Sequence, residues 1–261
     1  MEHDPILIEL LGPPGVGKTL VSKLIERQSP AARRPLPFKR RVGEVRWHDR
    51  MRQRHLGLLL PWLPSGLRRH AAKDAYRRRN RRIDARGLQD FAHRYPGLPE
   101  YLLDLLSRRA APAAEKVLLL DWFQRLYVDH AIATQHSGPE DRLLLDESFA
   151  QKAVTLFLHL GLETEPLGNY LSLVPVPNTL LVVEASVETL FARNERRGWP
   201  GWLTLGNVED RYQLLADCRD RILWIAQTYE QRGCRVIRVS NDHLDRTGLA
   251  REVDQLIQKL P

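Results

Sequence analysis

An apolar run that leads into the pattern G-x-x-x-x-G-K-T constrains this chain more than any other stretch. The run covers Ile6 to Leu11, the pattern covers Gly12 to Thr19, and apolar residues at helical spacing follow from Leu20. A buried strand, a glycine-rich turn and a helix in this order form a P-loop, or Walker A motif. In such a loop, backbone N–H groups surround a phosphate at the positive end of the helix. We therefore predict that the chain binds a nucleoside triphosphate.

The residue types of the motif suggest a role for each part of it. Three glycines let the backbone turn its N–H groups inward, and Lys18 can bridge the β- and γ-phosphates. The hydroxyl of Thr19 can bind Mg²⁺, so ATP or GTP with Mg²⁺ is the expected cofactor. The predicted nucleotide-contacting residues are Gly12, Pro13, Pro14, Gly15, Val16, Gly17, Lys18, Thr19 and Leu20.

Length and composition favour one domain, residues 1–261, with an ample core, because 43% of the residues are hydrophobic. No apolar run approaches the roughly 20 residues that span a bilayer, and no signal peptide precedes the first strand. Cys218 and Cys234 lack the spacing of a metal site and read as reduced thiols. These features predict a cytoplasmic protein.

Further apolar runs predict a parallel sheet that helices cover on both faces. Such runs occur at 142–147, 179–184 and 235–240, and each is followed by a helical pattern. The expected helices begin at Phe149, after Ser186 as the N-cap, at Val208 and at Thr247. The predicted fold class is therefore the α/β, three-layer P-loop NTPase fold, with a basic, mostly helical insertion at 31–112.

Two carboxylates end the run at 142–147. Asp146 would lie at the carboxyl end of a buried strand, where it could hold Mg²⁺, and Glu147 could orient a nucleophile or take its proton. The alternative is an acidic strand end that only caps the next helix.

Three arginines follow the run at 179–184. Spacings of three and four residues place Arg193 on one helical face with Arg196 and Arg197, before a loop rich in glycine and tryptophan at 198–202. These guanidinium groups could close over phosphates as a lid and neutralise transferring charge. A solvated basic face is the alternative.

The insertion carries most of the positive charge. Residues 31–94 hold 19 Lys and Arg against 5 Asp and Glu, whereas the whole chain has a net charge of +8. Within the insertion the pattern suggests a weak strand at 42–47, an apolar island at 56–67 and one arginine-rich helix at 71–91. The charge favours an anionic substrate or an acidic membrane surface as partner; nucleic acid is less favoured because stacking aromatics are sparse. A merely solvated surface is the remaining interpretation.

The motifs GPPGVGKT, LLLDES and VETLFARNERRG, with the final strand RVIRVS, resemble those of the P-loop nucleoside and nucleotide kinase superfamily, in its thymidylate-kinase-like form. The resemblance implies a parallel sheet, an acidic residue after a middle strand, an arginine-bearing lid and an adenine-contacting segment from Ser240. It does not extend to 31–112, where the nucleobase signature of the family is missing.

The sequence therefore predicts an ATP- and Mg²⁺-dependent kinase for a small, anionic or lipid-linked acceptor. Its catalytic residues would be Lys18, Asp146, Glu147, Arg193, Arg196 and Arg197, with Thr19 and Asp146 as metal ligands. The runner-up is a P-loop ATPase whose basic segment binds a nucleic acid or another acidic partner. A sulfotransferase is disfavoured by the intact Gly-Lys-Thr, which suits a Mg²⁺-triphosphate.

Overall fold

A computed structural model describes residues 4–53, 64–78, 80–199, 208–242 and 246–261. The strands form one five-stranded parallel sheet in the order β2-β3-β1-β4-β5. Their bounds are β1 Ile6–Leu11, β2 Leu36–Pro37, β3 Arg142–Leu145, β4 Thr179–Glu184 and β5 Arg235–Ser240. The predicted α/β fold class is thus confirmed.

The chain divides into two compact units. The first, here the P-loop unit, consists of Leu7–Pro35 and Leu144–Pro261. The second, here the helical unit, consists of Leu36–Leu143 and the segment that ends at Ile6.

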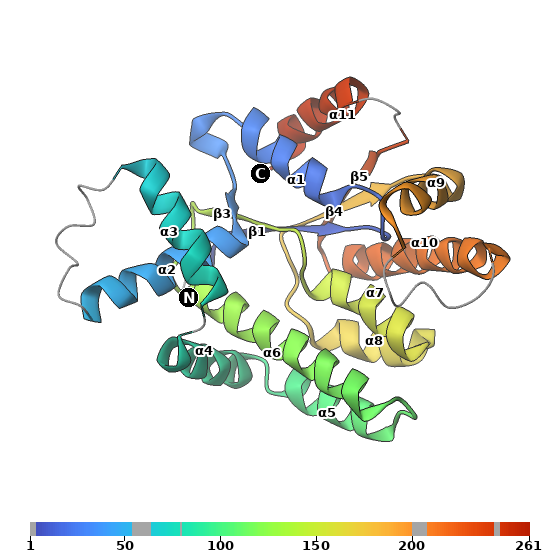
Figure 1. The fold of residues 1–261 in the computed structure, drawn as a ribbon, viewed down its shortest axis with the longest axis horizontal. Helices are drawn as coiled ribbons and strands as arrows, with labels where there is room; N and C mark the ends of the chain where they lie inside the picture. The colour runs from blue at the N-terminus through green and yellow to red at the C-terminus, as the bar shows by residue number, and fades with distance from the viewer. Residues whose placement is uncertain (1–3, 54–63, 79, 200–207, 243–245) are drawn as a thin grey trace. The chain divides into compact units, whose positions relative to one another are not determined.

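In the P-loop unit, β1 pairs in parallel with β4, and β4 pairs in parallel with β5. The register places Leu10 opposite Leu181 and Leu181 opposite Ile237. Helices α1 and α11 cover one face of these strands, whereas α7, α8 and α10 pack together on the other face (Figure 1). The helices of the unit are α1 Lys18–Gln28, α7 Phe149–Leu160, α8 Thr164–Leu173, α9 Val187–Arg197, α10 Val208–Gln231 and α11 Arg246–Lys259.

The two central strands of the unit are buried on both faces, which is why they read as continuous apolar runs in the sequence. Leu10, Leu11 and Leu180–Val183 are inaccessible to solvent. Glu9 is a charged exception: it lies in the middle of β1 and is 1% exposed.

The helical unit consists mainly of helices that pack on one another, with α3 against α2 and both α2 and α4 against α6. A short 3₁₀ turn, η1 Ala31–Arg33, belongs to the P-loop unit and precedes β2 in the chain. The helices are α2 Phe38–Gln53, α3 Ser65–Arg77, α4 Arg81–Arg94, α5 Gly97–Arg108 and α6 Ala113–Gln135. Among the described residues, no helix is both long and apolar enough to span a membrane.

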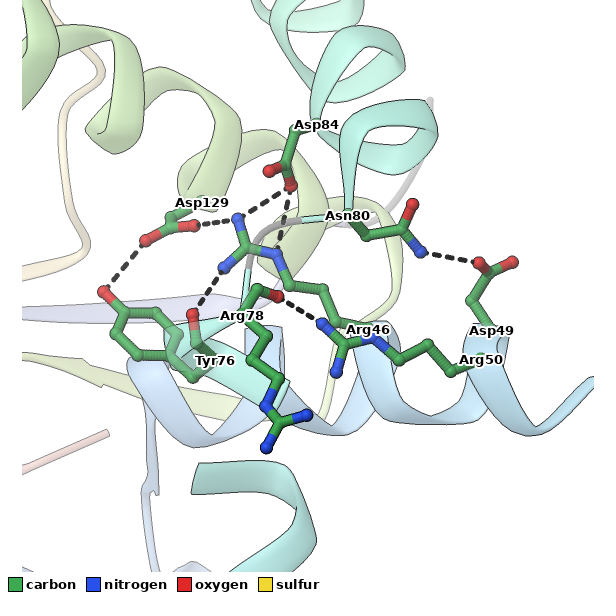
Figure 2. Close-up of polar contacts among 8 residues, drawn as sticks. All are labelled: Arg46, Asp49, Arg50, Tyr76, Arg78, Asn80, Asp84 and Asp129. Atoms are coloured by element: carbon green, nitrogen blue, oxygen red, sulfur yellow. Dashed lines mark hydrogen bonds and ion pairs between the residues drawn. The ribbon is translucent and has the colours of Figure 1, made fainter. Parts of the chain in front are cut away.

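A buried ion-pair network joins four helices of this unit (Figure 2). Arg46 of α2 is 5% exposed and lies 2.9 Å from both Asp84 of α4 and Asp129 of α6. Tyr76 of α3 takes part twice: its carbonyl accepts from Arg46, and its hydroxyl donates to Asp129 at 3.0 Å. One arginine of the basic segment therefore stabilises the helical packing and is not available at the surface.

The structure confirms most of the predicted elements and corrects two. Residues 42–47 belong to helix α2 and not to a strand, because the buried positions Phe38, Val42 and Arg46 recur every four residues. The single helix expected at 71–91 is two helices, α3 and α4, since the backbone is extended at Arg78 and Asn80. Helix α8 was not predicted. The apolar island at 56–67 and the loop at 198–202 lie largely outside the described residues.

Candidate functional site

The P-loop follows β1 and leads into α1 within the P-loop unit. Helix α1 begins at Lys18, after Gly17 with φ of 95°, and Gly15 also has a positive φ, of 86°. Both angles lie in the left-handed region that glycine adopts without strain. The ammonium of Lys18 donates to the carbonyls of Gly12, at 2.6 Å, and Pro13, at 3.2 Å. The lysine side chain therefore connects the end of the loop to its beginning.

Two asparagines that no sequence motif marked donate hydrogen bonds to this loop. The side-chain amide of Asn194, in α9, donates to the Pro14 carbonyl at 3.2 Å. The amide of Asn241, directly after β5, donates to the Val16 carbonyl at 2.5 Å. Both side chains are buried, with 0% and 3% exposure respectively. The one available sequence signal was the position of Asn241 at the carboxyl end of a parallel strand.

The three predicted lid arginines differ in their surroundings. Arg193 is half-buried and donates to the Val16 carbonyl of the P-loop at 3.4 Å. Arg197 is exposed, but its charge acts on the Lys18 ammonium. Arg196 is exposed, and its charge acts on Arg193. Spacing on one helical face did not reveal these differences.

The N-terminus of the helix that carries these arginines is fixed. Ser186 accepts from the Thr189 N–H, as the predicted N-cap. The carboxylate of Asp242 in turn accepts from both the N–H of Ser186, at 2.7 Å, and its hydroxyl, at 2.9 Å. The adjacent residues Asn241 and Asp242 therefore connect the end of β5 to the P-loop and to α9.

The acidic pair lies in the turn between β3 and α7. Burial lowers the pKa of the Lys18 ammonium to about 8; the carboxylates of Glu147 and Asp146 oppose this shift, and the charge of Arg197 adds to it. The two carboxylates and the guanidinium are thus close enough to the lysine to act on its charge. Cys218 also lies near the lysine, and burial raises the pKa of its thiol to about 12, so the thiol stays neutral.

Two contacts tie the acidic turn to the P-loop strand. The side-chain carbonyl of Gln151, in the first turn of α7, accepts from the Gly12 N–H at 3.2 Å. The carboxylate of Glu9 accepts a long hydrogen bond, 3.5 Å, from the Ala150 N–H. Burial raises the pKa of Glu9 to about 7, although Ser148 and the Ala150 N–H act to lower it. The turn that bears the acidic pair is thereby anchored to β1.

The helical unit contains a separate cavity of about 1070 Å³, which includes none of the predicted site residues. Its charged lining consists of Arg41, Arg52, Arg86 and Arg94 with Asp4, Glu44, Asp49 and Asp90. Because the arginines and carboxylates are equal in number, the lining does not identify an anionic ligand.

No family model and no curated protein matches the chain. Solved structures with a similar arrangement include deoxyadenosine kinase from M. mycoides with bound dCTP. It is 12% identical, with a TM-score of 0.44 over 98% of this chain and 100% of that one. The same enzyme with bound dATP gives 11% identity and a TM-score of 0.40 over 97% of this chain and 98% of that one. TT1252 from Thermus thermophilus is 20% identical, with a TM-score of 0.33 over 98% of each chain.

Proposed function

We propose that this chain is an ATP- and Mg²⁺-dependent phosphotransferase, a kinase, for a small-molecule acceptor. The observation that supports the proposal most is the arrangement around Lys18. The lysine ends the P-loop, and the charges of Asp146, Glu147 and Arg197 act on it. A phosphoryl-transfer site needs these groups together: donors for the phosphates, oxygen ligands for a metal ion and a cation for the transferring charge.

In this proposal the loop and Lys18 bind the triphosphate. The Lys18 ammonium would leave the carbonyls of Gly12 and Pro13 and pair with the β- and γ-phosphates. Its lowered pKa, about 8, would rise on that exchange, since two anionic phosphates would replace neutral carbonyls.

Thr19 and Asp146 are the proposed metal ligands. A hydroxyl and a carboxylate are hard oxygen donors of the kind that Mg²⁺ prefers, so the donor set fits this ion. The charge of Asp146 acts on Lys18, the residue before Thr19. When bound, Mg²⁺ would supply charge neutralisation on the phosphate oxygens.

Glu147 is the proposed base, which would orient the acceptor hydroxyl and take its proton. The arginines Arg193, Arg196 and Arg197 would neutralise the charge of the transferring group. Arg193 contacts the Val16 carbonyl, so a phosphate contact would require its side chain to leave that carbonyl.

The acceptor would be a small molecule, anionic or lipid-linked, and the basic helical segment 31–112 is the proposed insertion that selects it. The test is a screen for transfer of labelled phosphate from ATP to a panel of small acceptors, with and without nucleic acid. Transfer to one acceptor class supports the kinase. Release of inorganic phosphate alone, stimulated by a polymer, rejects the kinase.

One observation favours a second function, an ATPase whose basic surface binds an acidic partner. Arginines on α3, on α4 and at Arg78 between these helices are exposed, namely Arg68, Arg69, Arg77, Arg78, Arg81, Arg82 and Arg86. Counterion release from such a surface would drive binding to a polyanion or an anionic membrane.

A further inference from the structure

Asn194 and Asn241 donate hydrogen bonds to two carbonyls of the P-loop, those of residues 14 and 16. Asn194 binds the carbonyl of Pro14, and Asn241 binds that of Val16. The second carbonyl also accepts from Arg193. Side chains from α9 and from the end of β5 therefore fix two peptide groups, one on each side of Gly15–Val16.

The direction of a carbonyl determines the direction of the next N–H. A trans peptide group is planar, and its C=O and N–H point in opposite directions. With the carbonyls of Pro14 and Val16 held by the asparagines, the N–H groups of Gly15 and Gly17 must point away from these side chains. Within the part of the chain that the structure describes, neither N–H has an acceptor.

We propose that Asn194 and Asn241 are positioning residues that aim the Gly15 and Gly17 N–H groups at the nucleotide phosphates. This inference rests on the proposed function, because it assumes that the loop binds a phosphate. The asparagines need not touch the ligand: they act through the peptide groups they hold. Two correctly aimed donors are then present before the ligand arrives, which lowers the cost of organising the site.

The glycines opposite the two amides fit this role. A Cβ on Gly15 would lie 2.7 Å from Asn194 Nδ2, and a Cβ on Gly17 would lie 2.6 Å from Asn241 Nδ2. The amides approach the loop as closely as they do because no side chain intervenes. Each asparagine therefore depends on the glycine that it faces for its close approach to the loop.

Stability alone does not account for an asparagine at position 194. Its side-chain carbonyl is buried and has no hydrogen-bond partner among the described residues, which is costly in free energy. A leucine of similar volume would avoid that cost, but it could hold neither the Pro14 carbonyl, at 3.2 Å, nor the Leu190 carbonyl of its own helix, at 2.9 Å. The presence of the amide is explained if its role is to set the direction of the peptide group between Pro14 and Gly15.

The experiment compares Mg·ATP and inorganic triphosphate binding by calorimetry for the wild type, Asn194→Leu and Asn241→Leu. Each variant is expected to bind both probes at least about tenfold more weakly, the order of effect of losing one aligned hydrogen bond to a charged group. Thermal unfolding without ligand is measured in parallel. Should a leucine variant fail to fold, Asn194→Ala or Asn241→Ala takes its place, since alanine only removes the side chain.

Asn178→Ala is the matched control. Asn178 accepts from the Leu7 N–H at 2.7 Å, so it also bonds to the backbone of β1, but it does not touch the P-loop. This variant should lose stability and keep wild-type affinity. If the wild type binds and the variants at 194 and 241 bind equally well, the inference is wrong and the proposed function stands. If the wild type binds neither probe, both are wrong.

Discussion

The guanidinium of Arg46 and the carboxylate of Asp129 lie 2.9 Å apart, and both side chains are almost completely buried. Burial raises the pKa of Asp129, and Arg46 acts against this shift. The carboxylate therefore depends on the arginine to remain charged in the core of the helical unit (Figure 2).

Arg46→Met is expected to lower the free energy of unfolding by about 3–5 kcal/mol, because it leaves the buried carboxylate of Asp129 and the half-buried carboxylate of Asp84 without their cation. Chemical denaturation measures the change. Arg78→Met is the control, since Arg78 pairs with Asp74 at the surface. The control should change stability by less than about 1 kcal/mol. Equal effects of the two substitutions would contradict the proposed importance of the buried pair.

Glu9→Gln is expected to change how stability depends on pH. The pKa of Glu9 is about 7 in the folded protein, above its ordinary value of 4.5. Between these values the folded state binds more protons than the unfolded state, so this group lowers stability as pH rises from about 4.5 to about 7. The loss of folding stability from this group between low and high pH is roughly 3 kcal/mol.

Unfolding free energies of the wild type and Glu9→Gln at pH 5 and pH 8 test this prediction. The other titrating groups are common to both proteins and cancel in the difference. The wild type should lose stability relative to the variant at pH 8. A difference that does not vary with pH would show that Glu9 titrates normally.

Strong local patterns were sufficient to predict most elements of the P-loop unit from the sequence, although helix α8 was missed. Strands β4 and β5 and helix α7 have the predicted bounds, because buried parallel strands read as apolar runs and helices begin at recognisable caps. The helical unit was harder to predict. Its buried polar residue Arg46 looks like a surface residue in the sequence, which concealed the period of α2.

Sequence reasoning also missed the residues that act through long-range contacts. Asn194 and Asn241 are separated from the P-loop by more than 170 residues, and no local pattern marks a side chain that bonds to a distant carbonyl. Motif spacing located the residues expected to meet the phosphates. The side chains that bond to the loop carbonyls from distant elements became visible only in three dimensions.

Asp146→Asn should abolish Mg²⁺-dependent turnover, because an amide is a poorer ligand for a hard cation. Glu147→Gln should preserve nucleotide binding and slow turnover by roughly 10²–10⁴-fold if this residue is the base. Both are measured by steady-state kinetics with the acceptor from the transfer screen. Full activity of Glu147→Gln would favour the interpretation that this carboxylate only caps α7.

Binding to anionic vesicles should weaken steeply between low and physiological salt if the exposed arginines of α3 and α4 form a binding surface. Vesicle sedimentation at several salt concentrations measures this salt dependence. Replacing Arg81 and Arg82 together by Gln should reduce the binding and its salt dependence. Absence of vesicle binding even at low salt would leave these arginines as a solvated surface.

The most direct test of the central claim is calorimetric titration of Mg·ATP into the wild type and Lys18→Ala. The substitution removes the ammonium that donates to the Gly12 carbonyl, and Lys18 is not one of the buried core residues. We predict saturable binding by the wild type, a large loss of affinity in Lys18→Ala and unchanged circular dichroism. Equal Mg·ATP affinity in the two proteins, or no binding by the wild type, would contradict the assignment of this loop as the nucleotide site.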